Sequence, residues 1–154
     1  MFKEIISHER QRESLLQDVK QNNVSHAYLF AGPPQVGKFT VAKWFAWELL
    51  CVHGADRNEA ARLLERNIHP DVLVLDRLWV EGECTDWAVI ATSSNVPQEH
   101  RAHTPKARTN TIHIDDIRAL QERLFETSTS GVKILLIRSL ERLQEAAWNA
   151  LLKI

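Results

Sequence analysis

The sequence predicts an α/β fold in which a parallel sheet is covered by helices on both faces. Three short runs, at 26–31, 71–76 and 132–137, are almost continuously apolar, as strands buried on both faces of a sheet are. Segments with apolar residues at helical spacing lie between these runs. An order in which strands alternate with helices is typical of a parallel sheet, because parallel neighbours need crossover connections.

The first half of the chain alternates helix, strand and helix. Residues 8–23 carry an apolar stripe among charges and end at two asparagines, which predicts a helix. The run 26–31 ends at a glycine and predicts a buried strand. Residues 37–52 have a long apolar face, and 58–67 form a shorter helical pattern that a His-Pro pair ends.

The second half repeats this alternation. The buried strand 71–76 is followed, after a long gap, by a short strand at 111–114 and a helix at 115–128. The third core strand, 132–137, leads into a helical pattern from 140 to the last residue, with no stop signal. We therefore expect the whole protein to be longer than this chain.

The segment 77–110 does not follow the alternation. It has no periodicity, and its polar part 93–110 contains two prolines and no apolar face. A connection of this length is functional, disordered or inserted, and we expect a mobile loop or insertion. Its basic residues either contact the DNA backbone or lie in a solvated loop, which the composition favours. They are His100, Arg101, His103, Lys106 and Arg108.

Composition bounds the function classes. The 154 residues suffice for one domain, with 44% hydrophobic and 25% charged residues. A net charge of −1 gives no whole-domain argument for binding nucleic acid or a membrane. No apolar run approaches the roughly 18 residues of a membrane span, and two separate cysteines suggest a reducing compartment. We expect a cytoplasmic protein.

A glycine-containing stretch between the first predicted strand and the second predicted helix matches a phosphate-binding loop. Gly32, Gly37 and Lys38 fit the pattern G-x-x-x-x-G-K-[ST] with the required spacing. In such a loop, backbone N–H groups and the positive helix end hold phosphate, and the lysine reaches the outer phosphates. The candidate nucleotide-binding residues are Gly32, Pro33, Pro34, Gln35, Val36, Gly37, Lys38, Phe39 and Thr40.

The loop lacks groups that phosphoryl transfer needs. Phe39 stands where a Ser or Thr hydroxyl would ligate magnesium, and Thr40 lies about 100° further round the helix. Gln35 stands where a glycine would let the backbone approach a ligand. The strand 132–137 ends in Arg138 and not in a metal-binding carboxylate. We predict no catalytic residue, no magnesium site and no hydrolysis, while binding of ATP or ADP without turnover stays open.

Trp44, Trp47 and Trp148 allow two interpretations. Stacked aromatic rings can form a surface for nucleic-acid bases. Trp44 and Trp47 are three residues apart on an apolar helical pattern, which favours packing in the core.

Several stretches together resemble the bacterial DNA polymerase III clamp-loader subunits of the AAA+ group, delta-prime and gamma/tau. They are IISHERQRESLLQDVKQNNVSHAYLFAGPPQVGK, NIHPDVLVL, IHIDDIRALQERL and GVKILLIRSLERLQEAAWNALLKI. The resemblance covers most of the chain except roughly 77–110. It implies the N-terminal P-loop AAA+ domain, over 1–154, of a protein whose lid and collar domains lie beyond this chain. Active gamma-type subunits carry Thr or Ser after the lysine and Asp-Glu after the strand, which Phe39 and Arg138-Ser139 replace here.

The resemblance therefore implies a delta-prime-like subunit that does not hydrolyse ATP and helps load the sliding clamp onto primed DNA. Its implied partners are the gamma/tau and delta subunits, with primed DNA and the clamp reached through the complex, and no membrane. One alternative is an active gamma/tau-like ATPase whose atypical magnesium site uses Thr40 through water. The other is an unrelated P-loop regulator that binds a different phosphate ligand.

The family's zinc module, with four cysteines, is not reproduced. Cys51 lies near its first position, but the following residues supply no further cysteine. A closed tetrahedral site needs four ligands, which only a scattered set of Cys51, His53, His69 and Cys84 would provide. We predict no zinc and a buried, structural Cys51.

Overall fold

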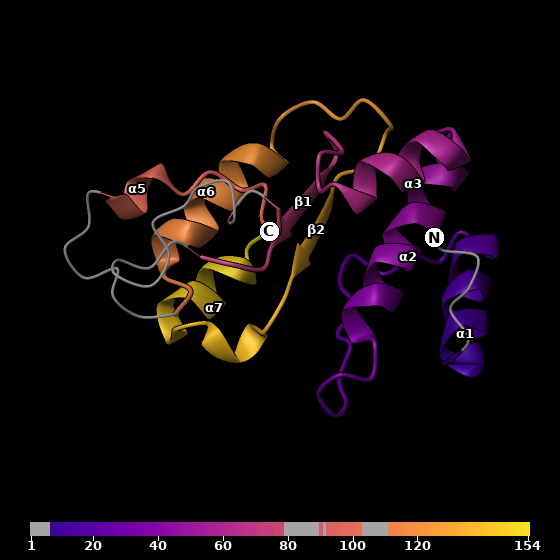
Figure 1. The fold of residues 1–154 in the computed structure, drawn as a ribbon, viewed down its shortest axis with the longest axis horizontal. Coiled ribbons are helices and arrows are strands. Elements are labelled where there is room, and N and C mark those ends of the chain that lie inside the picture. The colour runs from indigo at the N-terminus through magenta and orange to yellow at the C-terminus, as the bar shows by residue number, and fades with distance from the viewer. Residues whose placement is uncertain (1–6, 79–89, 91, 103–110) are drawn as a thin grey trace.

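The computed structural model describes residues 7–78, 90, 92–102 and 111–154. Two strands, β1 (Val72–Leu75) and β2 (Ile134–Ile137), lie between two groups of helices (Figure 1). The helical elements are α1 (Glu9–Lys20), α2 (Lys38–Val52), α3 (Arg57–Glu65), α5 (Glu99–Ala102), α6 (Ile114–Leu124), the 3-10 turn η2 (Leu140–Arg142) and α7 (Glu145–Leu151).

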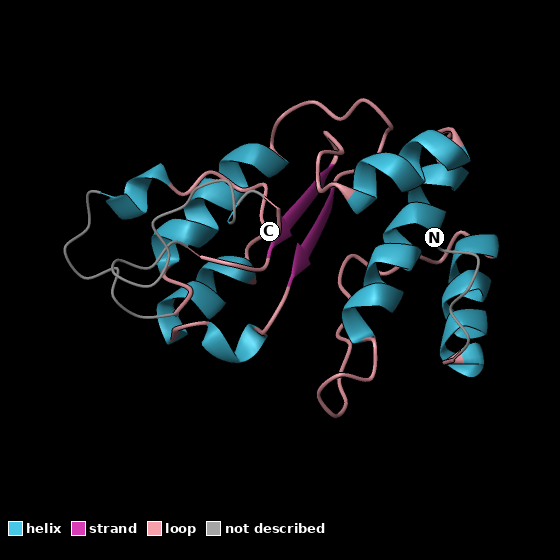
Figure 2. Ribbon diagram, viewed as in Figure 1, coloured by secondary structure: helices cyan, strands magenta, loops and turns pink. Residues whose placement is uncertain are grey.

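The sheet of the described residues is parallel, as predicted. β1 and β2 pair in register from Val72 opposite Ile134 to Leu75 opposite Ile137. Figure 2 shows α1, α2 and α3 on one side of the two strands and α6 and α7 on the other. The α/β class with helices on both faces is therefore confirmed. The arrangement is compatible with an N-terminal AAA+ domain.

The residues of β1 alternate between two hydrophobic cores. Val72 and Val74 join a cluster with Trp44, Leu50 and Leu64 from α2 and α3. All four residues of β1 are at most 2% exposed, as a strand covered on both faces requires. The second cluster contains Leu73, Leu75, Ile112, Ile117, Leu120, Leu143 and Ala147.

The prediction of core packing is confirmed for two of the tryptophans. Trp44 is 2% and Trp47 8% exposed, and both belong to the first cluster. The indole Nε1 of Trp47 donates a hydrogen bond to the carbonyl of Arg57 over 2.8 Å. Trp148, on α7, is 40% exposed. A base-stacking role for the α2 tryptophans is excluded by their burial.

The predicted strand at 26–31 is wrong, because these residues form no strand and Leu29 is 75% exposed. Aromatic burial explains the difference. The Tyr28 ring meets Phe45 edge to face at 5.0 Å between centroids, and its hydroxyl donates to a carboxylate oxygen of Asp18 over 3.1 Å. Tyr28 and Phe30 of the run therefore pack, partly buried, against the first cluster, and β2 gains no ladder from the run.

Two other predicted elements differ in length. The expected strand at 111–114 is a single bridge between Ile112 and Leu143, because α6 already begins at Ile114. The helical pattern from 140 is interrupted at Leu143, whose extended backbone separates η2 from α7.

Part of the segment 77–110 is packed onto the sheet. The side chain of Asn95 accepts a hydrogen bond from the Val74 N–H over 2.7 Å and donates to the Val72 carbonyl over 2.8 Å. The backbone N–H of Asn95 also donates to the Val74 carbonyl over 3.1 Å. Asn95 thus occupies the edge of β1 that faces away from β2. Residues 79–89, 91 and 103–110 lie outside the described residues, so a mobile loop there stays a prediction.

No helix within the described part of the chain has the length and apolar character that crossing a bilayer requires.

Candidate functional site

The predicted phosphate loop is an exposed turn that leads into α2. Gly32 has φ 147° and Gly37, the residue before α2, has φ 85°; both lie where glycine is favoured. Gln35 adopts φ 63°, so a side chain occupies a left-handed position in the middle of the loop. Pro33, Pro34, Gln35 and Val36 are all exposed. The loop backbone is therefore open to solvent over its whole tip.

Lys38 folds back onto its own loop. Its Nζ donates hydrogen bonds to the carbonyls of Gly32 and Pro33, over 2.8 Å and 2.6 Å. The other end of the loop is fixed by His8, whose Nε2 lies 2.6 Å from the Val36 carbonyl oxygen. The lysine charge therefore lies within the loop, close to where the motif would hold a phosphate.

Phe39 fills the position of the missing hydroxyl with an aromatic ring that two cations contact. The Nζ of Lys43 lies 5.3 Å from the ring centroid, and the guanidinium carbon of Arg138 lies 5.4 Å from it. Such contacts are favourable because the ring face carries partial negative charge. Thr40, the alternative hydroxyl, is exposed on the first turn of α2.

Arg138 comes from the end of β2 and is joined to the end of β1. Its Nη1 donates to the Asp76 carboxylate over 2.9 Å. Arg142 binds the backbone of both members of this pair. Its Nη2 donates to the carbonyls of Asp76 and Arg138, over 2.5 Å and 2.9 Å. The Asp76 carboxylate at the end of β1 is thus already engaged by the Arg138 guanidinium.

The cations near Phe39 share their surroundings with the Asp76 carboxylate. Burial lowers the pKa of Lys43, and the charges of Asp76 and Glu65 oppose this shift. Burial likewise lowers the pKa of Arg142, again against the charge of Asp76. These residues do not fit magnesium, because Phe39 offers no oxygen ligand and two cations flank the position where a hydroxyl would hold the ion.

The residues of the scattered zinc set are only partly described. Within the described ranges, no three His, Cys, Asp or Glu side chains are grouped so as to hold a metal ion. Cys84 lies outside these ranges, so the absence of zinc stays a prediction. Cys51 is half-buried against the first core, where burial raises the pKa of its thiol. The expected burial of Cys51 therefore holds in part.

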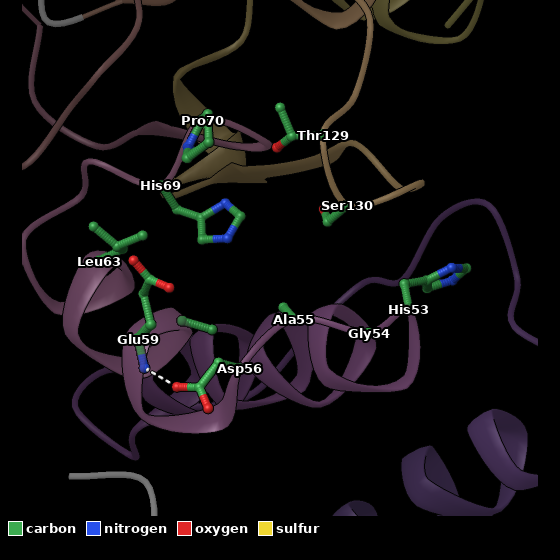
Figure 3. A pocket seen from close by; sticks show the side chains of 11 residues that line it. His53, Gly54, Ala55, Asp56, Glu59, Leu63, His69, Pro70, Thr129 and Ser130 are labelled. Carbon is green, nitrogen blue, oxygen red and sulfur yellow. Dashed lines mark hydrogen bonds between the residues drawn. The ribbon is translucent and has the colours of Figure 1, made fainter.

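A hollow of about 270 Å³ lies beside the start of α3 and shares no residue with the phosphate loop (Figure 3). Asp56 caps α3 by accepting hydrogen bonds from the N–H groups of Asn58 and Glu59, over 3.0 Å and 2.8 Å. The lining consists of His53, Gly54, Ala55, Asp56, Glu59, Ala60, Leu63, His69, Pro70, Thr129 and Ser130.

The polar groups of this hollow serve a buried carboxylate. Asp71, 0% exposed, accepts hydrogen bonds from the backbone N–H and the hydroxyl of both Thr129 and Ser130. Its own N–H donates to Nδ1 of His69 over 3.1 Å. Because Ser130 binds Asp71 directly and not through a histidine, the lining does not form an acid–base triad. Asp71 thus joins the turn before β2, at Thr129 and Ser130, to the start of β1.

Two residues of the predicted basic cluster lie in a structural contact. Arg101 and His100 both bind Asp116 on α6, with His100 Nε2 2.8 Å from Asp116 Oδ1. Arg101 is 2% exposed, so neither a solvated loop nor a free DNA contact describes it. His103, Lys106 and Arg108 lie outside the described residues. Composition could not reveal this contact, because Asp116 is distant in the sequence and looks like a helix-start carboxylate.

The described geometry can be compared with known proteins. The family profile described as "DNA polymerase III, delta subunit" matches residues 7–154. A DNA polymerase III subunit delta' from Pseudomonas aeruginosa is 30% identical over 135 residues, covering 84% of this chain and 33% of that protein. No solved structure matches the chain.

Subunits with a different designation are also similar. A DNA polymerase III subunit tau from Bacillus subtilis is 26% identical over 153 residues, covering 99% of this chain and 23% of that protein. A subunit tau/gamma from Haemophilus influenzae is 32% identical over 80 residues, covering 49% of this chain and 12% of that protein. The chain thus spans a third or less of the length of these curated relatives. Since the family profile matches nearly all of it, the chain belongs to the DNA polymerase III delta subunit family.

Proposed function

We propose that the chain is the N-terminal AAA+ domain of a delta-prime-like clamp-loader subunit that does not hydrolyse ATP. In this role it helps load the sliding clamp onto primed DNA in the cytoplasm, together with gamma/tau and delta subunits. The family supports a role in the DNA polymerase III assembly, and the loop chemistry supports the delta-prime-like assignment.

The observation that carries the assignment is the replacement of both metal ligands by groups that oppose a metal. A phenyl ring occupies the hydroxyl position and a guanidinium stands at the end of β2. Phosphoryl transfer in P-loop proteins depends on a metal that neutralises the developing charge on the phosphates. With Phe39 and Arg138 in these positions, we expect no turnover.

Hydrolysis is tested by a radiolabelled ATPase assay on the purified chain and on the full-length protein. We expect no phosphate release above a buffer control. Turnover in the wild type that disappears in Lys38→Ala would contradict the proposal. It would favour the active gamma/tau-like enzyme, for which the exposed hydroxyl of Thr40 on α2 is the specific support.

The assembly role is tested independently of nucleotide. The full-length protein, mixed with purified gamma/tau and delta subunits, is expected to co-elute with them in gel filtration and to support clamp loading on primed DNA. Lys38→Ala is expected to behave like the wild type in this assay. Failure of the wild type to co-elute would overturn the subunit role.

A further inference from the structure

Three cationic side chains, Lys38, Lys43 and Arg138, lie at or beside Phe39 at the start of α2. Arg138 is at the end of β2, and its side chain is 54% exposed although it is paired with Asp76. Lys43 and Arg138 both contact the Phe39 ring, and Lys38 is next to Phe39 at the start of α2. Three cationic side chains therefore lie on or beside Phe39, and the Asp76 carboxylate offsets part of their charge.

We propose that the loop binds a diphosphate or triphosphate group without a divalent cation, with Arg138 neutralising the phosphate charge in place of the metal. The inference deepens the proposed function, because it names the ligand state of the site of a non-hydrolysing subunit. Its ligand class is the metal-free polyphosphate of a nucleotide.

Three features of the site support this inference. An arginine presents fixed N–H donors that match phosphate oxygens and stays charged at every physiological pH. The exposed half of the Arg138 side chain leaves donors open to a ligand while Nη1 stays on Asp76. Lys38 is held by two loop carbonyls and not by a carboxylate, so a phosphate can draw it off without breaking an ion pair.

The same geometry predicts that magnesium does not strengthen binding of the phosphate ligand to the loop. A Mg²⁺ ion bound between phosphate oxygens beside Phe39 would stand near the charges of Arg138 and Lys43, which repel it. The ion would also find no protein oxygen from Phe39, and Asp76 is engaged by Arg138. Magnesium would therefore compete with the protein for the phosphates.

The test is calorimetric titration of the wild-type chain with ADP, and separately with inorganic pyrophosphate, in EDTA and in excess magnesium. We expect binding in EDTA at least as tight as in magnesium for both probes. Binding that requires magnesium, or binding in neither condition, overturns the inference. The subunit role does not depend on nucleotide and would survive either result, since co-elution with gamma/tau and delta tests it separately.

Charge variants locate the binding contribution. In EDTA, Arg138→Ala is expected to weaken ADP binding about tenfold, the usual effect of one charge-assisted hydrogen bond. Asp76→Asn is expected to strengthen it, because a competing carboxylate charge is removed. The matched control is Arg118→Ala on α6, whose arginine is 63% exposed and pairs with Asp115; it should leave the affinity unchanged.

The double variant Arg138→Ala/Asp76→Asn distinguishes a direct contact between Arg138 and the phosphate from an effect of the local net charge. It removes one positive and one negative charge, so the local net charge is that of the wild type. If Arg138 contacts the phosphate, affinity stays below that of Asp76→Asn and of the wild type. Wild-type affinity in the double variant would overturn the assigned contact. Circular dichroism melting of each variant verifies that the fold is retained.

Discussion

Arg101 and Asp116 form a two-point ion pair in the interior, with side chains that are 3% and 2% exposed. The arginine Nε lies 2.7 Å from Oδ1 and Nη2 lies 2.5 Å from Oδ2 of the carboxylate. The pair joins α5 to the first turn of α6. It connects a segment whose sequence shows no periodicity to the second hydrophobic core.

Breaking this pair from one side is expected to be costly. Arg101→Ala leaves the Asp116 carboxylate buried without its main partner, and such a loss destabilises by about 3–5 kcal/mol. Denaturant unfolding monitored by tryptophan fluorescence measures the effect. Arg118→Ala removes an exposed arginine from α6, the helix that carries Asp116. It should change stability by less than about 1 kcal/mol. Equal effects of the two variants would contradict a structural role for Arg101.

The buried carboxylate of Asp71 is expected to make stability fall in acid. Burial alone would raise the pKa of Asp71, but hydrogen bonds from Ser130 and Thr129 outweigh burial and hold the pKa well below its usual range. A depressed folded-state pKa contributes stability above the unfolded-state pKa, near 4 for Asp. That stability is lost as pH falls below this value.

Asp71→Asn tests this linkage. The amide cannot accept the same set of four donors, so the variant should lose about 1–3 kcal/mol at neutral pH. Its free energy of unfolding should also fall less steeply than that of the wild type between about pH 5 and pH 3. Parallel pH profiles for the two proteins would show that Asp71 does not titrate as inferred.

Asn95 is expected to protect the outer edge of β1. In Asn95→Ala the Val74 N–H and the Val72 carbonyl lose their side-chain partners, which costs about 1–3 kcal/mol if the groups stay buried. Hydrogen exchange read by NMR should show faster exchange of the Val74 amide. Asn149→Ala, on the exposed face of α7, provides the control and should leave that amide unchanged.

Restoring the two missing metal ligands should make ADP binding at the loop depend on magnesium. Phe39→Thr supplies the hydroxyl and Arg138→Asp supplies the carboxylate that metal-dependent loops carry. The double variant is expected to bind ADP more tightly in magnesium than in EDTA, and each single variant should show a smaller dependence. If magnesium has no effect on the double variant, the loop geometry itself, including Gln35 at φ 63°, prevents metal binding.

Sequence periodicity predicted the elements whose own residues form an apolar run or an apolar face. β1, β2, α2 and α6 follow from continuous apolar runs or apolar faces. β1, α2 and α6 supply buried core side chains as expected, whereas the residues of β2 are only half-buried and pack against the two cores. The run 26–31 shows the limit of this reasoning. An apolar run has the same composition whether it joins a sheet or packs its rings against helices, and here Tyr28 packs on Phe45.

The site was predictable in its chemistry and unpredictable in its contacts. The absence of a hydroxyl at Phe39 and of a carboxylate at Arg138 is visible in the sequence. That Arg138 and Lys43 flank the Phe39 ring depends on the packing of β2 beside α2, which no local pattern encodes. The same holds for Arg101 and Asp116, because only the tertiary fold brings them together.

The side-chain amide of Asn95 covers one edge of the sheet formed by β1 and β2. That amide accepts from the Val74 N–H and donates to the Val72 carbonyl, which are groups that a further strand would pair with on the side of β1 away from β2. Where Asn95 binds, this edge of β1 is therefore blocked, which hinders strand-to-strand pairing with another chain there.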